Sequence, residues 1–418
     1  MLGWIRIILL EKSSLDMEKC KRMEIRLPEA MIHLIQSFLS EEEAARTTLI
    51  SKSWYNAWLT RPVLVLRHFH RRSAEFSEFA VKTLRRYQDS NLKIESLRLK
   101  MPRCTITDCT VEPLARRLIV DAMKMGATDL NLEFIPPTFV PTMWMPTIVM
   151  PQEVLGSETL LRLSLCGCEI DGNVNCSMLK SLSLDRVHLK SADLLESITS
   201  CCNSIEELSL SNSYDISNNI SNYRTLLSGK NIHELHKLKR LYLEMVIVCN
   251  SFFDNLESRF PCLEDMSLVL CSCPPTLLTS SSLKRISMVQ CLASRIEFEV
   301  PNLAIFSYSA DKHVLSSIIS ISIKARDEWE SHISMECHHF RISSSWYRDL
   351  HKLLTQLSSS RINLAINIGS GSVSDILGAV AKPVAVENLR VEAEYVVGRI
   401  IRCLYRYMSP QVGNSLLA

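Results

Sequence analysis

The chain has 418 residues, of which 47% are hydrophobic and 22% are charged, the balance of a globular protein with a sizeable core. Its 47 Lys and Arg against 45 Asp and Glu give a formal net charge of +2, which excludes the strong basic excess typical of nucleic-acid binders. With only 11 Gly and 15 Pro, the sequence is neither collagenous nor largely disordered.

The start of the chain predicts little regular structure. Its first apolar segment, LGWIRIILL, contains Arg6 and is followed by no small-residue cleavage site, so it does not predict a signal peptide. No apolar run in the chain reaches the roughly 18 residues that span a bilayer. Residues 1–23 are therefore expected to be a poorly ordered extension, and we expect a nuclear or cytoplasmic protein with no membrane partner and with reduced thiols.

Residues 24–62 predict a helical module. Met31, Leu34, Ile35 and Phe38 fall at i, i+3, i+4 and i+7, which makes one apolar stripe on a first helix. Pro28 suits the first turn of that helix. A module of this size buries little surface, so it is expected to complete its core against something else.

Two further helices are predicted in this module. Ser40 and Glu43 have the spacing of a capping box that opens a second helix. Ala44, Ala45, Thr48 and Leu49 are expected to face inward from it. Ser51 can cap a third helix, on which Trp54 and Trp58 stand four residues apart and share one face.

The order of these residues resembles an F-box. The matching features are the pair Leu27-Pro28, the cluster around Ile35, Ala44, and the segment LISKSW that ends at Trp54. The resemblance implies docking on a Skp-type adaptor and, through it, on a cullin, by helices packed into a helical groove. It assigns this contact to Leu27, Pro28, Ile35, Phe38, Leu39, Ile50 and Trp54. The alternative is an ordinary three-helix cap whose tryptophans are core residues.

A repeat occupies most of the remaining chain. The pattern apolar-x-x-apolar-x-apolar recurs at intervals of 19 to 33 residues, close to the period of leucine-rich repeats. Each copy alternates apolar and polar residues, as a half-buried strand must. The copies are IESLRL, ATDLNL, LLRLSL, LKSLSL, IEELSL, LKRLYL, LEDMSL, LKRISM and LAIFSY, which begin at residues 94, 127, 160, 179, 205, 238, 263, 283 and 303.

These patterns define the predicted fold class and its parts. The class is α/β, with an N-terminal three-helix F-box followed by a leucine-rich-repeat solenoid that carries parallel strands on its concave face. Residues 63–93 are expected to be a helical linker or cap, because Phe76, Phe79, Ala80 and Leu84 share one helix face. Residues 94–310 are the predicted repeats, and 311–418 are expected to hold degenerate repeats, with strands in RINLAI and VENLRV, and a C-terminal cap.

From about residue 24 to 310, the order of phrases is similar to the plant F-box/leucine-rich-repeat family. After the F-box come F-S-E-F, KIESLRL, GATDLNL, LLRLSLCGC, LKSLSL and VPNLAIFSY. The resemblance implies a substrate-recognition subunit of an SCF-type ubiquitin ligase, which is itself not an enzyme. No function is carried over from the second C-terminal domain that some family members have.

The positions of the 15 cysteines decide their role. Cys168, Cys271 and Cys291 each lie three residues after the last apolar strand position, the Asn/Cys position of the repeat. They are therefore expected to be buried free thiols. No C-x-x-C pair exists, so no metal site is predicted.

Other chemical patterns are weak. GSGSVSDILG, with Gly369, Gly371 and Gly378, imitates a dinucleotide loop, but its third glycine is misplaced and a turn between repeats explains the same residues. The basic run RHFHRR at 67–72 is read as a solvated linker face or as a contact for a phosphate or acidic partner. We predict no catalytic residue and no cofactor.

The sequence thus favours a receptor whose repeats bind a target protein and no nucleic acid. Target contacts are expected from polar residues of the concave face. A leucine-rich-repeat scaffold that binds no adaptor is the first alternative, and an enzyme that uses the 369–378 loop is the second. The expected anchors for the target are Glu133, Asp185, Glu207, Tyr242, Glu244 and Arg285.

Overall fold

The computed structural model divides by its internal contacts into two compact units, Met1–Arg61 and Pro62–Ala418. The structure describes residues 27–39, 41–68, 73–102, 111–135, 148–190, 193–212, 214–215, 226–228, 232, 234–274, 276–293, 295–317, 320–326, 328–337, 344–368, 384–393 and 408–410.

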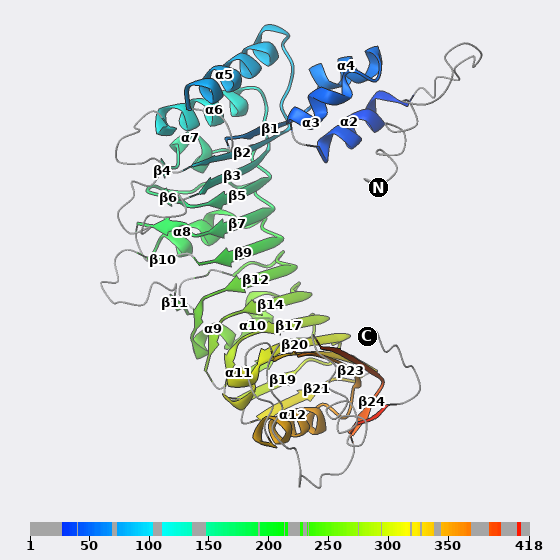
Figure 1. Ribbon diagram of the computed structural model, residues 1–418. Helices are drawn as coiled ribbons and strands as arrows, with labels where there is room; N and C mark the ends of the chain where they lie inside the picture. The colour runs from blue at the N-terminus through cyan, green and yellow to red at the C-terminus, as the bar shows by residue number, and fades with distance from the viewer. Residues whose placement is uncertain are drawn as a thin grey trace, which may run out of the picture. The chain divides into compact units, whose positions relative to one another are not determined.

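The first unit contains three short helices, drawn in dark blue in Figure 1. They are α2 (Glu29–Ser37), α3 (Glu41–Thr47) and α4 (Lys52–Leu59). Only Ile32, Ala44 and Ala57 are fully buried apolar residues among the described part of this unit. So small a core supplies little hydrophobic stabilisation.

Polar contacts complete the interior of the three-helix unit. Gln36 is fully buried on α2, and its Nε2 donates to Thr47 Oγ1 at 2.9 Å and to the Trp54 carbonyl at 3.2 Å. The buried Arg61 guanidinium donates to the Gln36 carbonyl at 3.2 Å. Because each helix supplies one of these groups, the network fixes how the three helices pack.

One inward residue of the second helix was predicted wrongly. Ala44 is buried as expected, but Leu49 is 88% exposed. Helix α3 ends at Thr47, so Leu49 lies in the turn that follows and not on the helix face. Ser40, the expected cap of this helix, lies outside the described residues.

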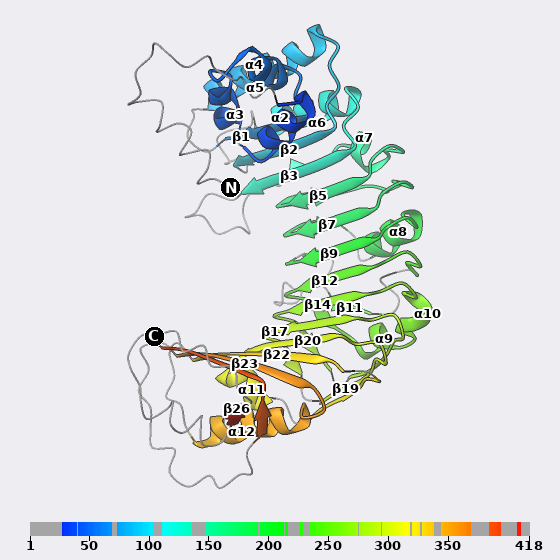
Figure 2. The same ribbon diagram turned by 90° about the vertical axis from the view of Figure 1, so that its right-hand side faces the viewer.

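The second unit is built on a thirteen-stranded sheet in which every pair of neighbours is parallel. The strands stack in chain order, as Figures 1 and 2 show. They are β1 (Val63–Arg67), β2 (Ser96–Pro102), β3 (Asp129–Ile135), β5 (Arg162–Cys166), β7 (Ser181–Asp185), β9 (Glu207–Ser211), β12 (Arg240–Glu244), β14 (Asp265–Val269), β17 (Arg285–Val289), β20 (Ile305–Asp311), β22 (Glu330–Cys337), β23 (Arg361–Ile368) and β25 (Asn388–Ala393).

All nine copies of the predicted repeat form strands of this sheet, from β2 to β20, and RINLAI and VENLRV supply β23 and β25. A large parallel sheet with alternating burial is the architecture of a leucine-rich-repeat solenoid. The sequence did not indicate β1, whose three central residues are all buried, or β22, which begins with the polar pair Glu330-Ser331. Neither strand carries the repeat phrase.

The core runs continuously along one face of the sheet. Leu99, Leu132 and Leu165 pair in register on adjacent strands, and none is more than 1% exposed. Helix α5 (Ser73–Asp89) packs against this core through the expected stripe, since Phe76 and Ala80 are buried. Stacked rows of this kind let each repeat bury its apolar residues against its neighbours.

Further helices and short strands lie beside the long sheet (Figure 1). The helices are α6 (Val111–Lys124), α7 (Gln152–Leu155), α8 (Leu194–Cys201), α9 (Asn250–Phe253), α10 (Leu256–Arg259), α11 (Lys312–Ser317) and α12 (Ser344–Gln356). The short parallel sheets are β10 (Tyr214–Asp215), β8 (His188–Leu189), β6 (Cys168–Ile170) and β4 (Ile148–Val149); β11 (Leu226–Leu227), β13 (Ile247–Val248), β15 (Ser272–Cys273) and β18 (Leu292–Ala293); β16 (Thr276–Thr279), β19 (Arg295–Glu299) and β21 (Ser320–Lys324); and β24 (Val384–Val386) with β26 (Met408–Pro410).

A repeated turn ends six consecutive strands, from β5 to β17. The residue after each strand has a positive φ, and its N–H donates at 2.7–3.0 Å to a carbonyl of the next strand of the long sheet. The acceptor is the last residue of that strand in five turns, and for Gln290 it is Ser309 of β20. This bond satisfies a backbone donor where the ladder stops. The residues at this position are Gly167, Arg186, Asn212, Met245, Leu270 and Gln290.

The cysteines at the Asn/Cys position of the repeat follow this turn. Cys168, Cys271 and Cys291 are fully buried free thiols, as expected. The Cys271 thiol contacts the Leu243 carbonyl at 3.4 Å, and the Cys291 thiol contacts the Leu268 carbonyl at 3.2 Å. A small, weakly polar side chain therefore fills this corner and caps a carbonyl of the preceding repeats.

Candidate functional site

The three-helix unit carries an exposed apolar surface. Large hydrophobic side chains on α2, on the turn after α3 and on α4 are between 46% and 88% exposed. Several large apolar side chains left exposed on one small unit are typical of a binding surface. The residues, called the apolar surface from here on, are Met31, Leu34, Phe38, Leu49, Ile50 and Tyr55.

The residues predicted to bind an adaptor divide by exposure. Pro28 is exposed, Phe38 is 76% exposed and Ile50 is 47% exposed, so these three are accessible to a partner. Leu27, Ile35, Leu39 and Trp54 are partly buried. Sequence reasoning missed Leu34 and Leu49 as contact candidates, because periodicity shows that residues share a helix face but not whether that face meets the core or solvent.

In the second unit, the open face of the long sheet carries a row of polar residues. Strand pairing places one residue from each strand directly beside the next, at the outward polar position predicted from the repeat. We call this the middle row. It consists, from β2 to β25, of Arg98, Asn131, Ser164, Ser183, Ser209, Tyr242, Ser267, Ser287, Ser307, His332, Asn363 and Asn388.

Charged residues two positions before the middle row pair across the strands. Asp129 accepts from Arg162 at 3.4 Å, Glu207 pairs with Arg240, and Asp265 pairs with Arg285 at 2.5 Å. Opposite charges on neighbouring strands favour this register, although exposed pairs each contribute little. These charges are therefore already engaged within the sheet.

Several predicted target anchors are engaged in the same way. Glu133 pairs with Lys100 at 2.6 Å, and Glu207 also accepts a hydrogen bond from Ser181 at 3.1 Å. Asp185 pairs with Arg186 at 3.0 Å. Arg285 is held by Asp265, and its pKa is raised chiefly by that hydrogen bond.

Tyr242 and Glu244 form a joined pair on β12. The Tyr242 hydroxyl donates to Glu244 Oε2 at 3.1 Å, and Ser211 donates to the same oxygen at 2.7 Å. Partial burial, followed by the hydrogen bond to Glu244, raises the pKa of Tyr242 to about 12. The phenol therefore stays protonated at neutral pH and can present only a neutral donor or acceptor to a target.

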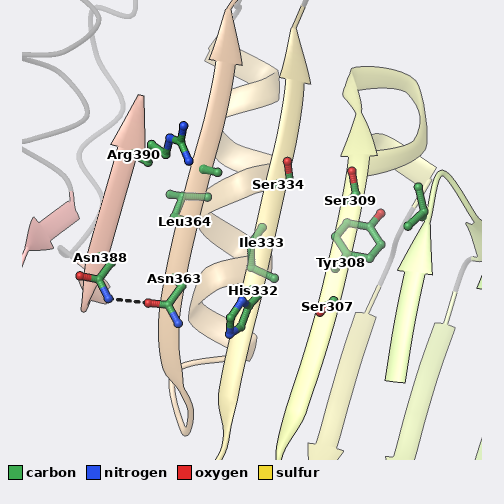
Figure 3. Close-up of a pocket in the computed structure, with 12 residues that line it drawn as sticks. Ser307, Tyr308, Ser309, His332, Ile333, Ser334, Asn363, Leu364, Asn388 and Arg390 are labelled. Atoms are coloured by element: carbon green, nitrogen blue, oxygen red, sulfur yellow. Dashed lines mark hydrogen bonds between the residues drawn. The ribbon is translucent and has the colours of Figure 1, made fainter. Parts of the chain in front are cut away.

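Two hollows lie over the central and later strands of the same sheet face. The first, of about 500 Å³, follows the middle row across β7, β9, β12, β14, β17 and β20 and includes Tyr242 and Arg285. The second, of about 420 Å³, lies over β20 to β25 (Figure 3). There the amide of Asn388 donates to Asn363 Oδ1 at 2.7 Å, and His332 Nε2 lies 3.1 Å from Glu330. Both hollows are lined by a mixture of hydroxyl, charged and apolar side chains, which can hydrogen-bond and pack against a polypeptide.

The described ranges contain neither a metal-binding cluster nor a helix fit to cross a membrane. Within those ranges, no group of three or more His, Cys, Asp or Glu residues is placed to hold a metal ion. None of the described helices has both the length and the apolarity needed to cross a bilayer. The glycine loop at 369–378 lies outside the described residues.

No protein-family model matches the chain. Two proteins of Arabidopsis thaliana, both named as F-box/LRR-repeat proteins, are similar to it at 27% and 28% identity, each over 44% of this chain. Over this part of its length, the chain is similar to plant F-box/LRR-repeat proteins. The matches span 36% and 38% of the two relatives' own lengths, so the chain corresponds to little more than a third of each.

The relationship to F-box/LRR-repeat proteins agrees with the long parallel sheet, since leucine-rich repeats place one strand per repeat in such a sheet. Neither the structure nor the two relatives identify a specific partner.

Proposed function

We propose that this protein is the substrate-recognition subunit of an SCF-type ubiquitin ligase. In this proposal the three-helix unit is an F-box that binds a Skp-type adaptor linked to a cullin. The open face of the long sheet binds the target protein. The chain itself supplies proximity and no catalysis, because holding a target near the ubiquitin-carrying enzyme makes their encounter effectively intramolecular.

The observation that carries the proposal is the apolar surface of the three-helix unit. Its core holds only Ile32, Ala44 and Ala57 as fully buried apolar residues, whereas Phe38 and Leu49 are 76% and 88% exposed. Covering these side chains with a partner's groove would recover hydrophobic free energy that the unit cannot gain alone. The F-box/LRR-repeat relatives support an adaptor as that partner.

An adaptor pull-down tests this proposal. The full chain is co-expressed with a Skp-type adaptor, as wild type, as a Leu27→Ala/Pro28→Ala variant and as a Phe38→Ser/Leu49→Ser variant. Each large apolar side chain that is buried on binding contributes about 2 kcal/mol, so we expect recovery of adaptor by the Phe38/Leu49 variant to fall more than tenfold.

Leu277→Ser is the matched control, because Leu277 is 57% exposed on β16 in the other unit. Its adaptor recovery is expected to equal that of the wild type. If the wild type and both variants of the three-helix unit recover equally little adaptor, the protein is a leucine-rich-repeat scaffold and not a ligase subunit.

The target proteins are then found by comparing protein abundance in cells with and without the chain. Proteins that accumulate when the Phe38/Leu49 variant replaces the wild type, and that co-purify with both forms, are expected targets. A target that binds the chain but whose ubiquitination is unchanged by this variant would contradict the ligase role.

A further inference from the structure

Two arginines at the β1 end of the open sheet face differ from the other charged residues there. Arg67 ends β1 and Arg98 lies in the middle row on β2, and both are exposed. Neither guanidinium has an ion-pair or hydrogen-bond partner in the part of the chain that the structure describes. Unengaged guanidiniums can bind an outside anion without first breaking an internal pair.

These arginines share a hollow of about 430 Å³ with Lys100, Asp129, Asn131 and Glu133. Both carboxylates in the hollow already have cations, because Glu133 pairs with Lys100 at 2.6 Å and Asp129 pairs with Arg162 at 3.4 Å. The positive charge of Arg67 and Arg98 is therefore not neutralised. The hollow favours an anionic ligand.

Strand register sets the spacing of the two guanidiniums. Val65 pairs with Arg98 and Arg67 pairs with Lys100, so Arg67 and Arg98 are diagonal neighbours on one face of adjacent strands. Strand spacing and rise place their Cα atoms about 8 Å apart. In an extended peptide, alternate residues point to the same side about 7 Å apart, a separation that two flexible arginine side chains can match.

We propose that Arg67 and Arg98 bind an acidic segment of extended polypeptide, in which two carboxylates two residues apart each take one guanidinium. The planar fork of arginine pairs with a carboxylate through two parallel hydrogen bonds. One phosphate dianion would have to draw both arginines to a single point beside Glu133 and Asp129. Two separate carboxylates need no such convergence. The inference that the bound segment belongs to a ligase target rests on the proposed function. The anion site itself is formed by residues of the second unit alone.

Binding of short peptides to the purified full chain tests the site without an adaptor. The probe is a fluorescent heptapeptide with blocked ends, Gly-Ser-Glu-Ser-Glu-Ser-Gly. Its comparators are the isomer with adjacent glutamates, the version with glutamines, and one with a single phosphoserine in place of the two glutamates. We expect the alternating probe to bind most tightly, about tenfold better than the glutamine version, with affinity that falls as salt is added.

Single Arg67→Gln and Arg98→Gln variants are each expected to weaken binding of the alternating probe at least fivefold. Arg240→Gln is the matched control, because it removes an equal charge from the same face where Glu207 already pairs with the arginine. Its affinity for the probe should stay within twofold of wild type. Thermal unfolding checks that every variant is folded.

The proposal is overturned if Arg240→Gln weakens binding as much as Arg98→Gln, if the adjacent-glutamate isomer binds equally well, or if the phosphoserine peptide binds better than the alternating probe. The last result would assign the site to phosphorylated targets.

Adaptor recovery is measured on the same preparations. Failure of peptide binding with intact adaptor recovery refutes only this inference, and loss of adaptor recovery with intact peptide binding refutes only the proposed function.

Discussion

Burial separates residues of the same type into chemically different groups, and the cysteines show this most clearly. Cys201 and Cys202 are consecutive, yet Cys201 is exposed and Cys202 is fully buried at the end of α8. Burial raises the pKa of Cys202 to about 11 and that of Cys273 to about 12. Because the thiolate is the reactive form, a buried thiol with a raised pKa is protected twice, by access and by protonation.

We therefore expect iodoacetamide at pH 8 to alkylate Cys201 in the native protein while Cys202 stays unmodified. Raising the pH to 9 should not change this, since Cys202 gains appreciable thiolate only near its pKa of about 11. Mass spectrometry of tryptic and further digested peptides resolves the two sites. Equal labelling of both residues before unfolding would contradict the described burial, and labelling of both in urea is the positive control.

Among the elements, the strand-exit turns carry a backbone requirement that the repeat pattern does not reveal. Asn212 has φ 50, and its N–H donates to the Glu244 carbonyl at 3.0 Å. The left-handed conformation costs most L-residues about 1–2 kcal/mol, whereas glycine adopts it freely and asparagine tolerates it. After the turns at Leu270 and Gln290, the next residues, Cys271 and Cys291, are fully buried.

Substitution of Asn212 tests this requirement. We expect Asn212→Gly to leave thermal stability almost unchanged and Asn212→Val to cost about 1–2 kcal/mol, because a β-branched residue is disfavoured at positive φ. The control is Ser183→Val in the middle row, where valine meets an ordinary strand conformation and should be tolerated. An unfolding midpoint for Asn212→Val equal to that of Asn212→Gly would show that this turn is not under the proposed constraint.

For the whole molecule, the division into two compact units separates the two binding roles that we propose. The three-helix unit has a minimal core and an exposed apolar surface, and the second unit has a continuous core with a polar open face. Hydrophobic burial suits a permanent partner such as an adaptor, while polar and charged contacts suit selective recognition of a target.

We therefore expect the two roles to be independent in a double-mutant cycle. Phe38→Ser/Leu49→Ser should abolish adaptor recovery and leave affinity for the alternating-glutamate peptide within twofold of wild type. Arg67→Gln/Arg98→Gln should do the reverse. The combined variant should show the sum of both effects, measured by pull-down and by peptide titration. A coupling above about tenfold in either measurement would mean that the units do not act separately.

Much of the fold was predictable because each copy of the repeat alternates apolar and polar residues along a single strand. Ser183 and Ser209 lie between apolar residues that recur at strand spacing, and the structure pairs these serines side by side. By contrast, Leu64, Val65 and Leu66 follow one another in β1 without alternation, and β22 is polar at its start, so neither gave a strand signal of the repeat type. Both strands became visible only through pairing with distant neighbours.

The sequence predicted which residues lie at the candidate site, but not which of their charges are paired. Glu207 and Arg285 were correctly placed on the open face, yet their pairing with Arg240 and Asp265 depends on which strands become neighbours. Arg67 stood in a basic run whose role was left open, and its lack of a partner is a property of the assembled sheet. The sequence alone shows which residues are charged, but not which of them form ion pairs.

The sequence by itself determined the repeat, the alternation of buried and open positions, the three-helix pattern and the burial of the cysteines at the strand exits. All of these follow from side-chain periodicity within a single element. The tertiary structure decided that Leu49 faces solvent, that the charges near the middle row are engaged, and that Arg67 and Arg98 are not. Exposure and charge pairing depend on contacts between residues of different elements. Periodicity within one element does not predict those contacts.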